Sequence, residues 1–193
     1  MIFVIDTTSA RSALALLRPD GKVVAEQIDA SGPGFDLPAR FRAMAGRQAL
    51  TKVAVAVGPG SFTGLRVGVS FGLGLAMGLA VPIVPMPSLG LQAARSSAPV
   101  VAVTEAGRGR VYFLAPGSEP GLAEPEDLPT GWPIAGWLRP GTEAALSAAG
   151  LTFKPDSELL SFGAAAALRL ESAFEVAYGS LRLEYMQAFS TRA

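Results

Sequence analysis

The chain has 193 residues, half of them apolar, with 16 Lys/Arg balanced by 16 Asp/Glu and with no histidine or cysteine. This length and apolar content suit a globular protein of one large domain or two small lobes, and exclude a disordered chain. The missing residue types exclude disulfides, Cys/His zinc sites and Ser-His catalytic triads, so that only a carboxylate magnesium site remains open. Residues 1–100 hold nine Lys/Arg against five Asp/Glu and the rest hold seven against eleven, so neither half predicts stand-alone nucleic-acid binding.

The N-terminal residues predict an antiparallel meander of three strands. Its first member is a continuous apolar run, typical of a central strand, and a Pro-Asp-Gly turn at 19–21 separates the second and third. The N-terminus has no basic segment, so we expect no signal peptide and a cytoplasmic protein. The predicted elements are strands at 2–5, 12–17, 22–28 and 52–57, and a short helix at 36–46.

A long helix follows the glycine turn at residue 58 and is predicted to end near Leu79. Small residues recur at every fourth position of this helix, although glycine costs about 1 kcal/mol relative to alanine in a helix interior. Close approach of a second helix would explain the row, because no side chain then separates the two backbones. We expect the helix to pack on its own sheet with one side and on another chain with the other. The predicted partner interface comprises Gly64, Leu65, Gly68, Val69, Gly72, Leu73 and Ala76.

A membrane span is the rival interpretation of this helix, because residues 67–84 contain no charge and are long enough to be considered. Prolines at 82, 85 and 87 interrupt its far end, and no Lys/Arg cluster flanks it. A soluble α/β unit therefore fits better, and we expect no contact with a membrane.

The remaining residues predict a smaller second lobe. A Pro/Gly/acid segment at 115–131 is expected to be a surface loop, and the tail at 180–189 has no clear period. The predicted domains are an N-terminal lobe at 1–98 with the interface helix, and a C-terminal lobe at 99–193 whose tail packs back on the first. Its predicted elements, with those that lead into it, are strands at 81–84, 99–104, 110–114, 133–137 and 151–153 and helices at 89–95, 142–149 and 157–170.

Two segments could together hold a phosphate or a hydrated metal. An acid beside hydroxyls ends the first strand, and the glycine turn opens a helix whose N–H groups could bind an anion. The alternative is that these groups only satisfy turn backbone and allow close packing. Glu105, at the corresponding strand end of the second lobe, is the only candidate for a second acid. The residues of this vestigial nucleotide or phosphate site are Asp6, Thr7, Thr8, Gly58, Gly60 and Ser61.

Two patterns resemble known proteins. Ile5-Asp6-Thr7-Thr8 before a hairpin resembles the actin-like ATPase superfamily, and residues 58–68, Gly-Pro-Gly-Ser-Phe-Thr-Gly-Leu-Arg-Val-Gly, resemble the signature of the TsaB (YeaZ) family. The likeness continues through Gly109-Arg110-Val111-Tyr112 and Ser180-Leu181-Arg182. It implies an α/β fold of the actin-like (ASKHA, ribonuclease H-like) type, with two lobes that each hold a mixed sheet flanked by helices.

The resemblance also implies a function in making threonylcarbamoyladenosine in tRNA. The chain would be a non-catalytic scaffold that binds a TsaD homologue, is joined by a TsaE homologue, and meets tRNA only through the complex. TsaD would modify the adenosine beside the anticodon in ANN-decoding tRNAs. The resemblance implies no catalytic residue, no metal and no cofactor in this chain. Alone, the chain is expected to form a homodimer through the same apolar surface.

Two enzymatic alternatives remain open. An actin-like phosphotransferase or ATPase would use Asp6, Thr8 and the 58–61 turn with a nucleotide and magnesium. A peptidase would need Ser61 paired with a lysine, and none of the three lysines has an obvious place beside it.

Overall fold

The structure is a computed structural model that describes residues 1–32 and 34–184. Its first sheet has the order β3-β2-β1-β4-β5, built from β1 (Ile2–Asp6), β2 (Arg11–Leu17), β3 (Val23–Ala30), β4 (Lys52–Gly58) and β5 (Ile83–Pro87). The first three strands pair antiparallel, which confirms the predicted meander, and β4 joins β1 in parallel. Continuous apolar runs place β1 and β4 in the buried centre of this sheet.

The second sheet repeats the arrangement of the first. Its order is β8-β7-β6-β9, with β6 (Val101–Gly107), β7 (Arg110–Leu114), β8 (Gly121–Ala123) and β9 (Ile134–Ala135). As in the first lobe, a central strand pairs antiparallel with its hairpin partner and in parallel with the strand on its other side. The repeat means that Asp6 and Glu105 are each the fifth residue of the central strand of a lobe.

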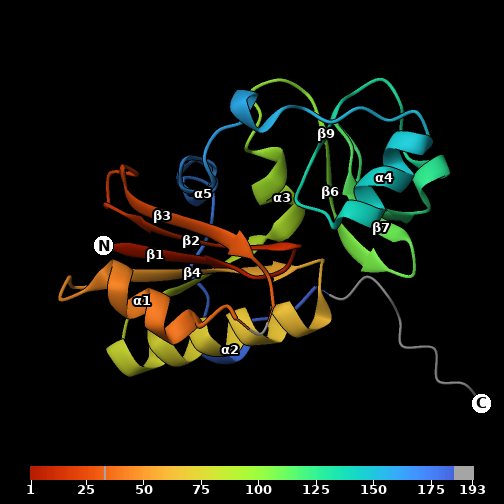
Figure 1. Ribbon diagram of the computed structural model, residues 1–193. Helices are drawn as coiled ribbons and strands as arrows, with labels where there is room; N and C mark the ends of the chain where they lie inside the picture. The colour runs from red at the N-terminus through yellow and green to blue at the C-terminus, as the bar shows by residue number, and fades with distance from the viewer. Residues whose placement is uncertain (33, 185–193) are drawn as a thin grey trace, which may run out of the picture.

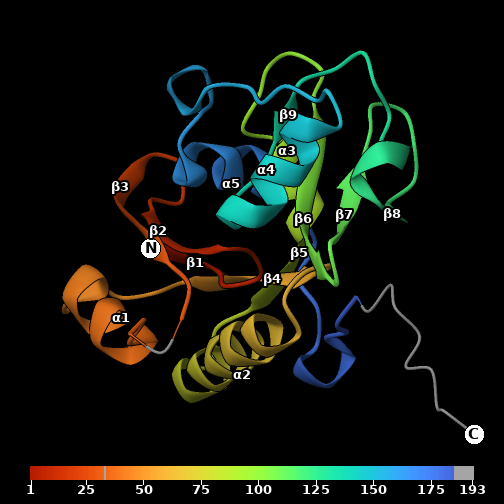
Figure 2. The same ribbon diagram turned by 45° about the vertical axis from the view of Figure 1, so that its right-hand side comes forward.

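Helices cover both faces of the first sheet (Figure 1). On one face lie α1 (Leu37–Ala45) and α2 (Phe62–Leu79), and on the other lie α3 (Ser88–Ala93) and α5 (Phe162–Leu170). Figure 2 shows that α3 also lies beside the second sheet, whose own helix is α4 (Pro140–Ala148). The two lobes therefore share one helix between their sheets.

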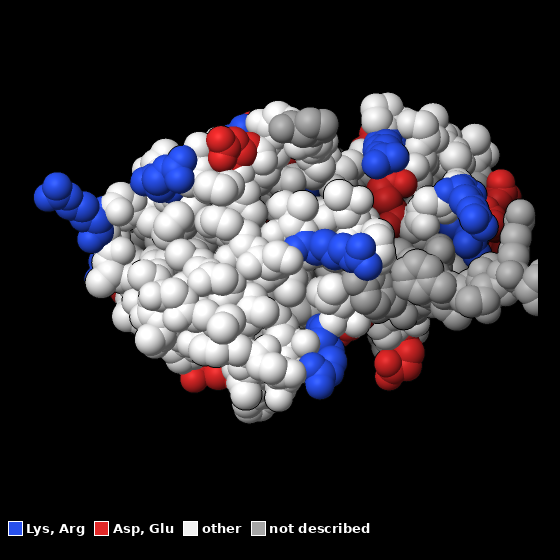
Figure 3. All heavy atoms as spheres, turned by 90° about the horizontal axis from the view of Figure 1, so that it is seen from below, with Lys and Arg blue, Asp and Glu red and all other residues white. Residues whose placement is uncertain are grey.

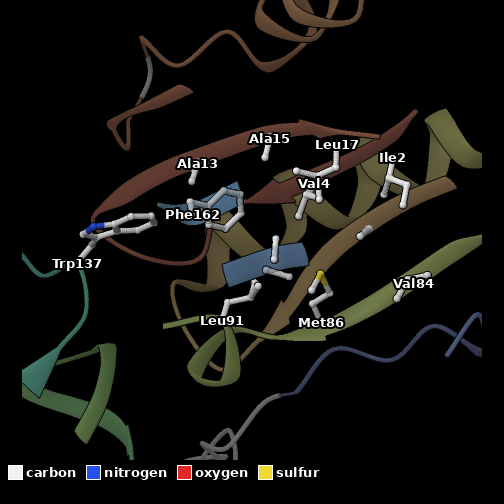
Figure 4. Close-up of a cluster of buried hydrophobic side chains, with 13 residues drawn as sticks. Ile2, Val4, Ala13, Ala15, Leu17, Val84, Met86, Leu91, Trp137 and Phe162 are labelled. Atoms are coloured by element: carbon white, nitrogen blue, oxygen red, sulfur yellow. The ribbon is translucent and has the colours of Figure 1, made fainter. Parts of the chain in front are cut away.

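The first lobe has a hydrophobic cluster on each side of its sheet. Figure 4 shows the cluster beneath α5 and α3, where Phe162 and Leu91 meet side chains of β1, β2 and β5, and Trp137 of the second lobe closes one end. On the opposite side, Phe41 of α1 stacks edge-on between Phe3 of β1 and Phe71 of α2, with ring centroids 5.0 and 5.8 Å apart.

A network of contacts joins the lobes. Thr104 of β6 donates to the Pro59 carbonyl at 3.1 Å, and the Ala10 N–H donates to the Trp137 carbonyl at 3.2 Å. The buried Arg95 guanidinium stacks on the Trp137 ring and pairs with Asp156 at 3.1 Å. These contacts hold the β1–β2 hairpin and the glycine turn against the second lobe.

The structure differs from the expected elements mainly in the second lobe. The predicted loop at 115–131 contains the short edge strand β8 and a 3-10 turn, η1 (Pro125–Asp127). The predicted helix at 157–170 begins only at Phe162, because Ser161 caps it and a separate turn, η2 (Asp156–Glu158), precedes it. The predicted strand at 151–153 is a single bridge between Phe153 and Ile134. Part of the aperiodic tail at 180–189 lies outside the described residues.

Among the described residues, α2 alone is long and apolar enough to cross a membrane by length and composition. It instead packs one face against β4 and β1. The membrane alternative therefore does not explain its buried face.

Candidate docking helix and strand-end site

Hydrogen bonds hold the loop that leads into α2. Ser61 caps the helix by accepting from the Gly64 N–H at 3.3 Å, and its own N–H donates to the Thr8 carbonyl at 2.7 Å. The Gly58 N–H donates to the Ser88 hydroxyl at 3.1 Å. The glycine turn and the β1–β2 hairpin, which we predicted as one site, are therefore in direct contact.

The row of small residues on α2 faces the chain's own sheet. A Cβ atom on Gly64 would lie 1.8 Å from the Thr7 carbonyl oxygen, and one on Gly68 would lie 2.4 Å from the Thr7 hydroxyl. That hydroxyl donates to the Gly64 carbonyl at 2.6 Å. The row exists because β1 and the start of α2 approach backbone to backbone.

This packing corrects the predicted interface. Buried residues cannot form the surface on which a partner docks, and the helix's close neighbour is strand β1 rather than a second helix. A leucine at Gly68 would clash with the Thr7 side chain and disturb the fold itself. Of the predicted set, Leu65, Gly68, Val69, Gly72 and Ala76 are buried, while Gly64 and Leu73 are partly buried.

The exposed face of α2 carries a second row of small residues two columns away. Ser70, Gly74 and Gly78 are exposed, and a Cβ atom on either glycine would meet nothing within 4 Å. Beside this row, Val67 and Met77 are 48% and 56% exposed. We call the face formed by Arg66, Val67, Ser70, Gly74, Met77 and Gly78 the outer face of α2.

A shallow groove of about 380 Å³ borders the outer face, between α1 and α2. Figure 3 looks onto this side of the molecule, where a broad area without charged side chains is bordered by a few Lys and Arg. An apolar area with a charged border is typical of a surface that another protein covers. The groove is lined by Pro38, Phe41, Arg42, Ser70, Phe71, Gly74 and Leu75.

Asp6 is fully buried at the end of β1. Its Oδ1 accepts hydrogen bonds from the Thr8 N–H at 2.8 Å and the Thr8 hydroxyl at 2.7 Å, whereas Oδ2 has no partner. Burial raises the pKa of this carboxyl above its ordinary value, and the two bonds from Thr8 partly oppose that shift. The carboxylate stabilises the hairpin turn, which is the structural role weighed for it from the sequence.

Glu105, the candidate second acid, is occupied in a different way. Its Oε1 accepts from the Arg139 N–H at 2.7 Å and its Oε2 accepts from the Thr142 hydroxyl at 3.0 Å. Both oxygens therefore cap the start of α4, where a negative charge is favourable. Asp6 and Glu105 each accept hydrogen bonds from one backbone N–H group and one threonine hydroxyl close by.

The predicted phosphate loop leaves little space beside the hairpin. A Cβ atom on Gly60 would lie 2.4 Å from the Thr8 carbonyl oxygen, so the two backbones touch at this point. Within residues 1–32 and 34–184, no group of three or more His, Cys, Asp or Glu could hold a metal ion. An open cleft of about 830 Å³ lies between the start of α2, the hairpin and the start of α4. Thr7 and Ser61 of the predicted site line it, and Arg11 and Arg139 lie on its walls.

Sequence reasoning missed the outer face and the groove beside it. The column Arg66, Ser70, Gly74 and Gly78 was visible as a second small row, but nothing in the periodicity distinguished it from the first. Pairing of α1 with α2 through Phe41 and Phe71 was also invisible, because the two helices are separated by a strand in the chain.

Comparisons with known proteins concern the family and the fold. Residues 23–119 match the family model described as TsaD, tRNA N6-adenosine threonylcarbamoyltransferase. The tRNA threonylcarbamoyladenosine biosynthesis protein TsaB of Bacillus subtilis is 36% identical over 121 residues, which are 58% of this chain and 52% of that protein. The match therefore spans about half the length of that curated relative.

Solved structures extend the likeness over nearly the whole chain. YeaZ from Pseudomonas aeruginosa superimposes with a TM-score of 0.70 at 19% identity, over 96% of this chain and 99% of that one. A Pseudomonas aeruginosa protein described as similar to peptidase YeaZ gives a TM-score of 0.68 at 18% identity, with the same coverage. These likenesses confirm the predicted fold class, an actin-like α/β fold of two lobes.

Proposed function

We propose that the chain, which belongs to the family whose model is described as TsaD and is similar to the TsaB protein of Bacillus subtilis, takes part in threonylcarbamoyladenosine synthesis in tRNA as a non-catalytic subunit. Its partner in this proposal is a TsaD homologue, which carries out the transfer to the adenosine beside the anticodon. A TsaE homologue joins the pair, and tRNA is reached through the complex. The work of this chain is assembly, carried out in the cytoplasm.

The observation that carries the proposal is the outer face of α2. The side chains at 67 and 77 expose apolar surface to water, and the glycines at 74 and 78 lack side chains that would block another chain. A partner that covered this face would remove the apolar surface from water. Glycines there let a partner helix approach closely, at a cost of about 1 kcal/mol each in helix propensity. The groove toward α1 offers space for the side chains of that helix. In the free chain, a second copy would cover the same face.

Gly74→Leu tests the proposal, because Gly74 lines the groove and a Cβ atom there meets no part of the chain within 4 Å. We expect the variant to remain folded and to lose the complex with the TsaD homologue of the same organism in size-exclusion chromatography and calorimetry. Gly141→Leu on α4 is the matched control, since a Cβ atom there also meets nothing within 4 Å. An unchanged complex with Gly74→Leu would refute docking through this face.

The enzymatic alternative is a phosphotransferase or ATPase that uses Asp6 and the 58–61 turn. It has less support, because Oδ1 of Asp6 accepts from Thr8 and both oxygens of Glu105 accept hydrogen bonds at the start of α4, which leaves only the buried Oδ2 of Asp6 without a bond. Phosphoryl transfer needs acids free to hold a magnesium ion. Magnesium-dependent ATP turnover by the purified chain, lost in Asp6→Asn, would favour this alternative over assembly alone.

A further inference from the structure

The last described residues contact α2 at both of its ends. Val176 forms a bridge with Ile83 of β5, and the chain then passes through a 3-10 turn, η3 (Tyr178–Ser180), toward the start of the helix. The Glu184 N–H donates to the Val57 carbonyl at 2.8 Å, at the end of β4. Residues 176–184 thus run from the C-terminal end of α2 to the loop from which α2 starts.

At the C-terminal end of α2, the Tyr178 hydroxyl reaches the backbone of the last turn and of the loop that follows it. It lies 2.8 Å from the Val81 carbonyl oxygen and 3.2 Å from that of Ala76. The Ala76 carbonyl also accepts from the N–H groups of Ala80 and Val81, so the tyrosine adds a side-chain donor where the helix ends. The tyrosine is about a hundred residues farther along the chain, so this bond joins distant parts of the sequence.

At the other end, the same segment packs beside the glycine turn. Leu181 and Leu183 lie against the hydrophobic cluster between the sheet and α2. A Cβ atom on Gly58 would lie 2.7 Å from the Glu184 carbonyl oxygen, so the two backbones are in close contact. The segment therefore limits the movement of the turn that begins the helix.

Helix α2 needs this support more than an ordinary helix would. Five of its 18 residues are glycines, each of which weakens a helix by about 1 kcal/mol relative to alanine. Its inner row also contributes almost no side-chain packing of its own. A helix of low intrinsic stability stays formed through tertiary contacts, so the contacts at its two ends have unusual weight.

We infer that residues 176–184 form a strap that holds α2 in place and thereby sets the position of its outer face. The inference rests on the proposed function only in its second part, where the outer face is the docking surface. Binding of the partner to α2 and closure of the strap then favour one another, because coupling between two sites is reciprocal. A change in the strap would then alter the affinity of the outer face for the partner, although the strap is not part of that face.

Hydrogen exchange of the free chain tests the strap without any partner. We expect a chain ending at Glu175 to keep both sheets but to exchange the α2 amides at least tenfold faster. A chain ending at Glu184, which retains every contact described above, should exchange like the full chain. Equal exchange of α2 in all three chains would overturn the inference.

Point variants keep the test valid if the shorter chain fails to fold. Tyr178→Phe removes only the hydroxyl, and loss of one hydrogen bond should raise exchange of the amides near Ala80 and Val81 about fivefold. Leu183→Ala should act at the start of α2, and Phe174→Ala, a change at an 83% exposed ring just before the strap, is its control. No increase in either strap variant would contradict the inference.

Titration with the TsaD homologue separates the two proposals. If the strap variants loosen α2 and weaken the complex by about the same factor, both proposals are supported. Faster exchange with an unchanged affinity would leave the strap in place and refute docking through α2. Protection of Arg182 from trypsin by the bound partner would support the reciprocal coupling directly, and unchanged cleavage would refute it.

Discussion

The two small-residue rows of α2 look alike in the sequence but have opposite roles in the structure. The inner row, with Gly64, Gly68 and Gly72, lies against Thr7, Ile5 and Val55 of the central strands. The outer row, with Ser70, Gly74 and Gly78, meets no part of the chain at its two glycines. A row of glycines in a sequence permits close approach but does not say which element approaches. Here the inner row lies close to the first sheet, whereas no part of the chain approaches the glycines of the outer row.

The largest expected effect comes from a side chain on the inner row. Gly64→Val would place a branched side chain within the space of the Thr7 carbonyl, so the helix must move off β1. We expect a destabilisation of at least about 3 kcal/mol, which corresponds to a fall in Tm of roughly 6–12 °C for a chain of this size. Thermal unfolding followed by circular dichroism measures it.

Gly74→Val is the matched change on the outer row and should leave Tm almost unaltered. Equal losses for the two variants would mean that both rows are packed in the folded chain, and the comparison would fail.

A charge on the outer face should act on assembly alone. Ser70→Glu places a carboxylate in the groove that Arg42 also lines and one turn from Arg66, where a docked partner would have to desolvate it. We expect the affinity for the TsaD homologue to fall at least about tenfold, close to 1.4 kcal/mol. Stability of the free chain should change by less than about 0.5 kcal/mol.

Isothermal titration of wild type and Ser70→Glu provides the measurement. Ser147→Glu, the same change at an exposed position of α4, is the matched control for nonspecific charge effects. A Ser70→Glu complex as tight as that of the wild type would show that the outer face stays uncovered.

Single methyl groups sharpen the comparison further. Gly74→Ala adds a methyl in open space and should stabilise the helix by about 1 kcal/mol, or roughly 2–4 °C in Tm. Gly72→Ala gains the same propensity but meets Ile5 and Val55 at 3.3 and 3.4 Å, so we expect most of the gain to be cancelled. Chemical denaturation of both variants measures their free energies of unfolding. A larger gain in stability for Gly72→Ala than for Gly74→Ala would reverse the assignment of the inner and outer rows.

The smallest effect concerns the charge buried beneath the inner row. Because burial raises the pKa of Asp6 in the folded chain, the folded state holds this proton more tightly than the unfolded state. Stability from this group is therefore lost as pH rises from its ordinary value of 3.8 through the folded value. Asp6→Asn keeps an oxygen for both bonds from Thr8 and removes the titration.

We expect the Tm of the wild type to fall relative to that of Asp6→Asn as pH increases from 4 to 8. Parallel curves for Asp6→Asn and wild type would mean that Asp6 does not titrate differently on folding.

Periodicity and local signals determined most elements of this protein. Continuous apolar runs were sufficient to predict β1 and β4, since central strands buried on both faces need them. Ser61 and the glycine turn marked the start of α2, because a side-chain cap is a local feature. The motif at 58–68 led to the family and hence to the fold.

Tertiary structure alone decided which face of α2 is free. Both rows consist of small residues, and the residues on either side of them, at 65, 69, 73 and 77 and at 67, 71, 75 and 79, are apolar. The sequence therefore contains no amphipathic signal that would orient the helix. The choice is made by Thr7, which directly follows β1, is distant from α2 in the sequence and leaves no space for a Cβ atom at Gly64 or Gly68. The strap of residues 176–184 was likewise decided by packing, because Tyr178 contacts Val81 and Glu184 contacts Val57, which lie 97 and 127 residues earlier in the chain.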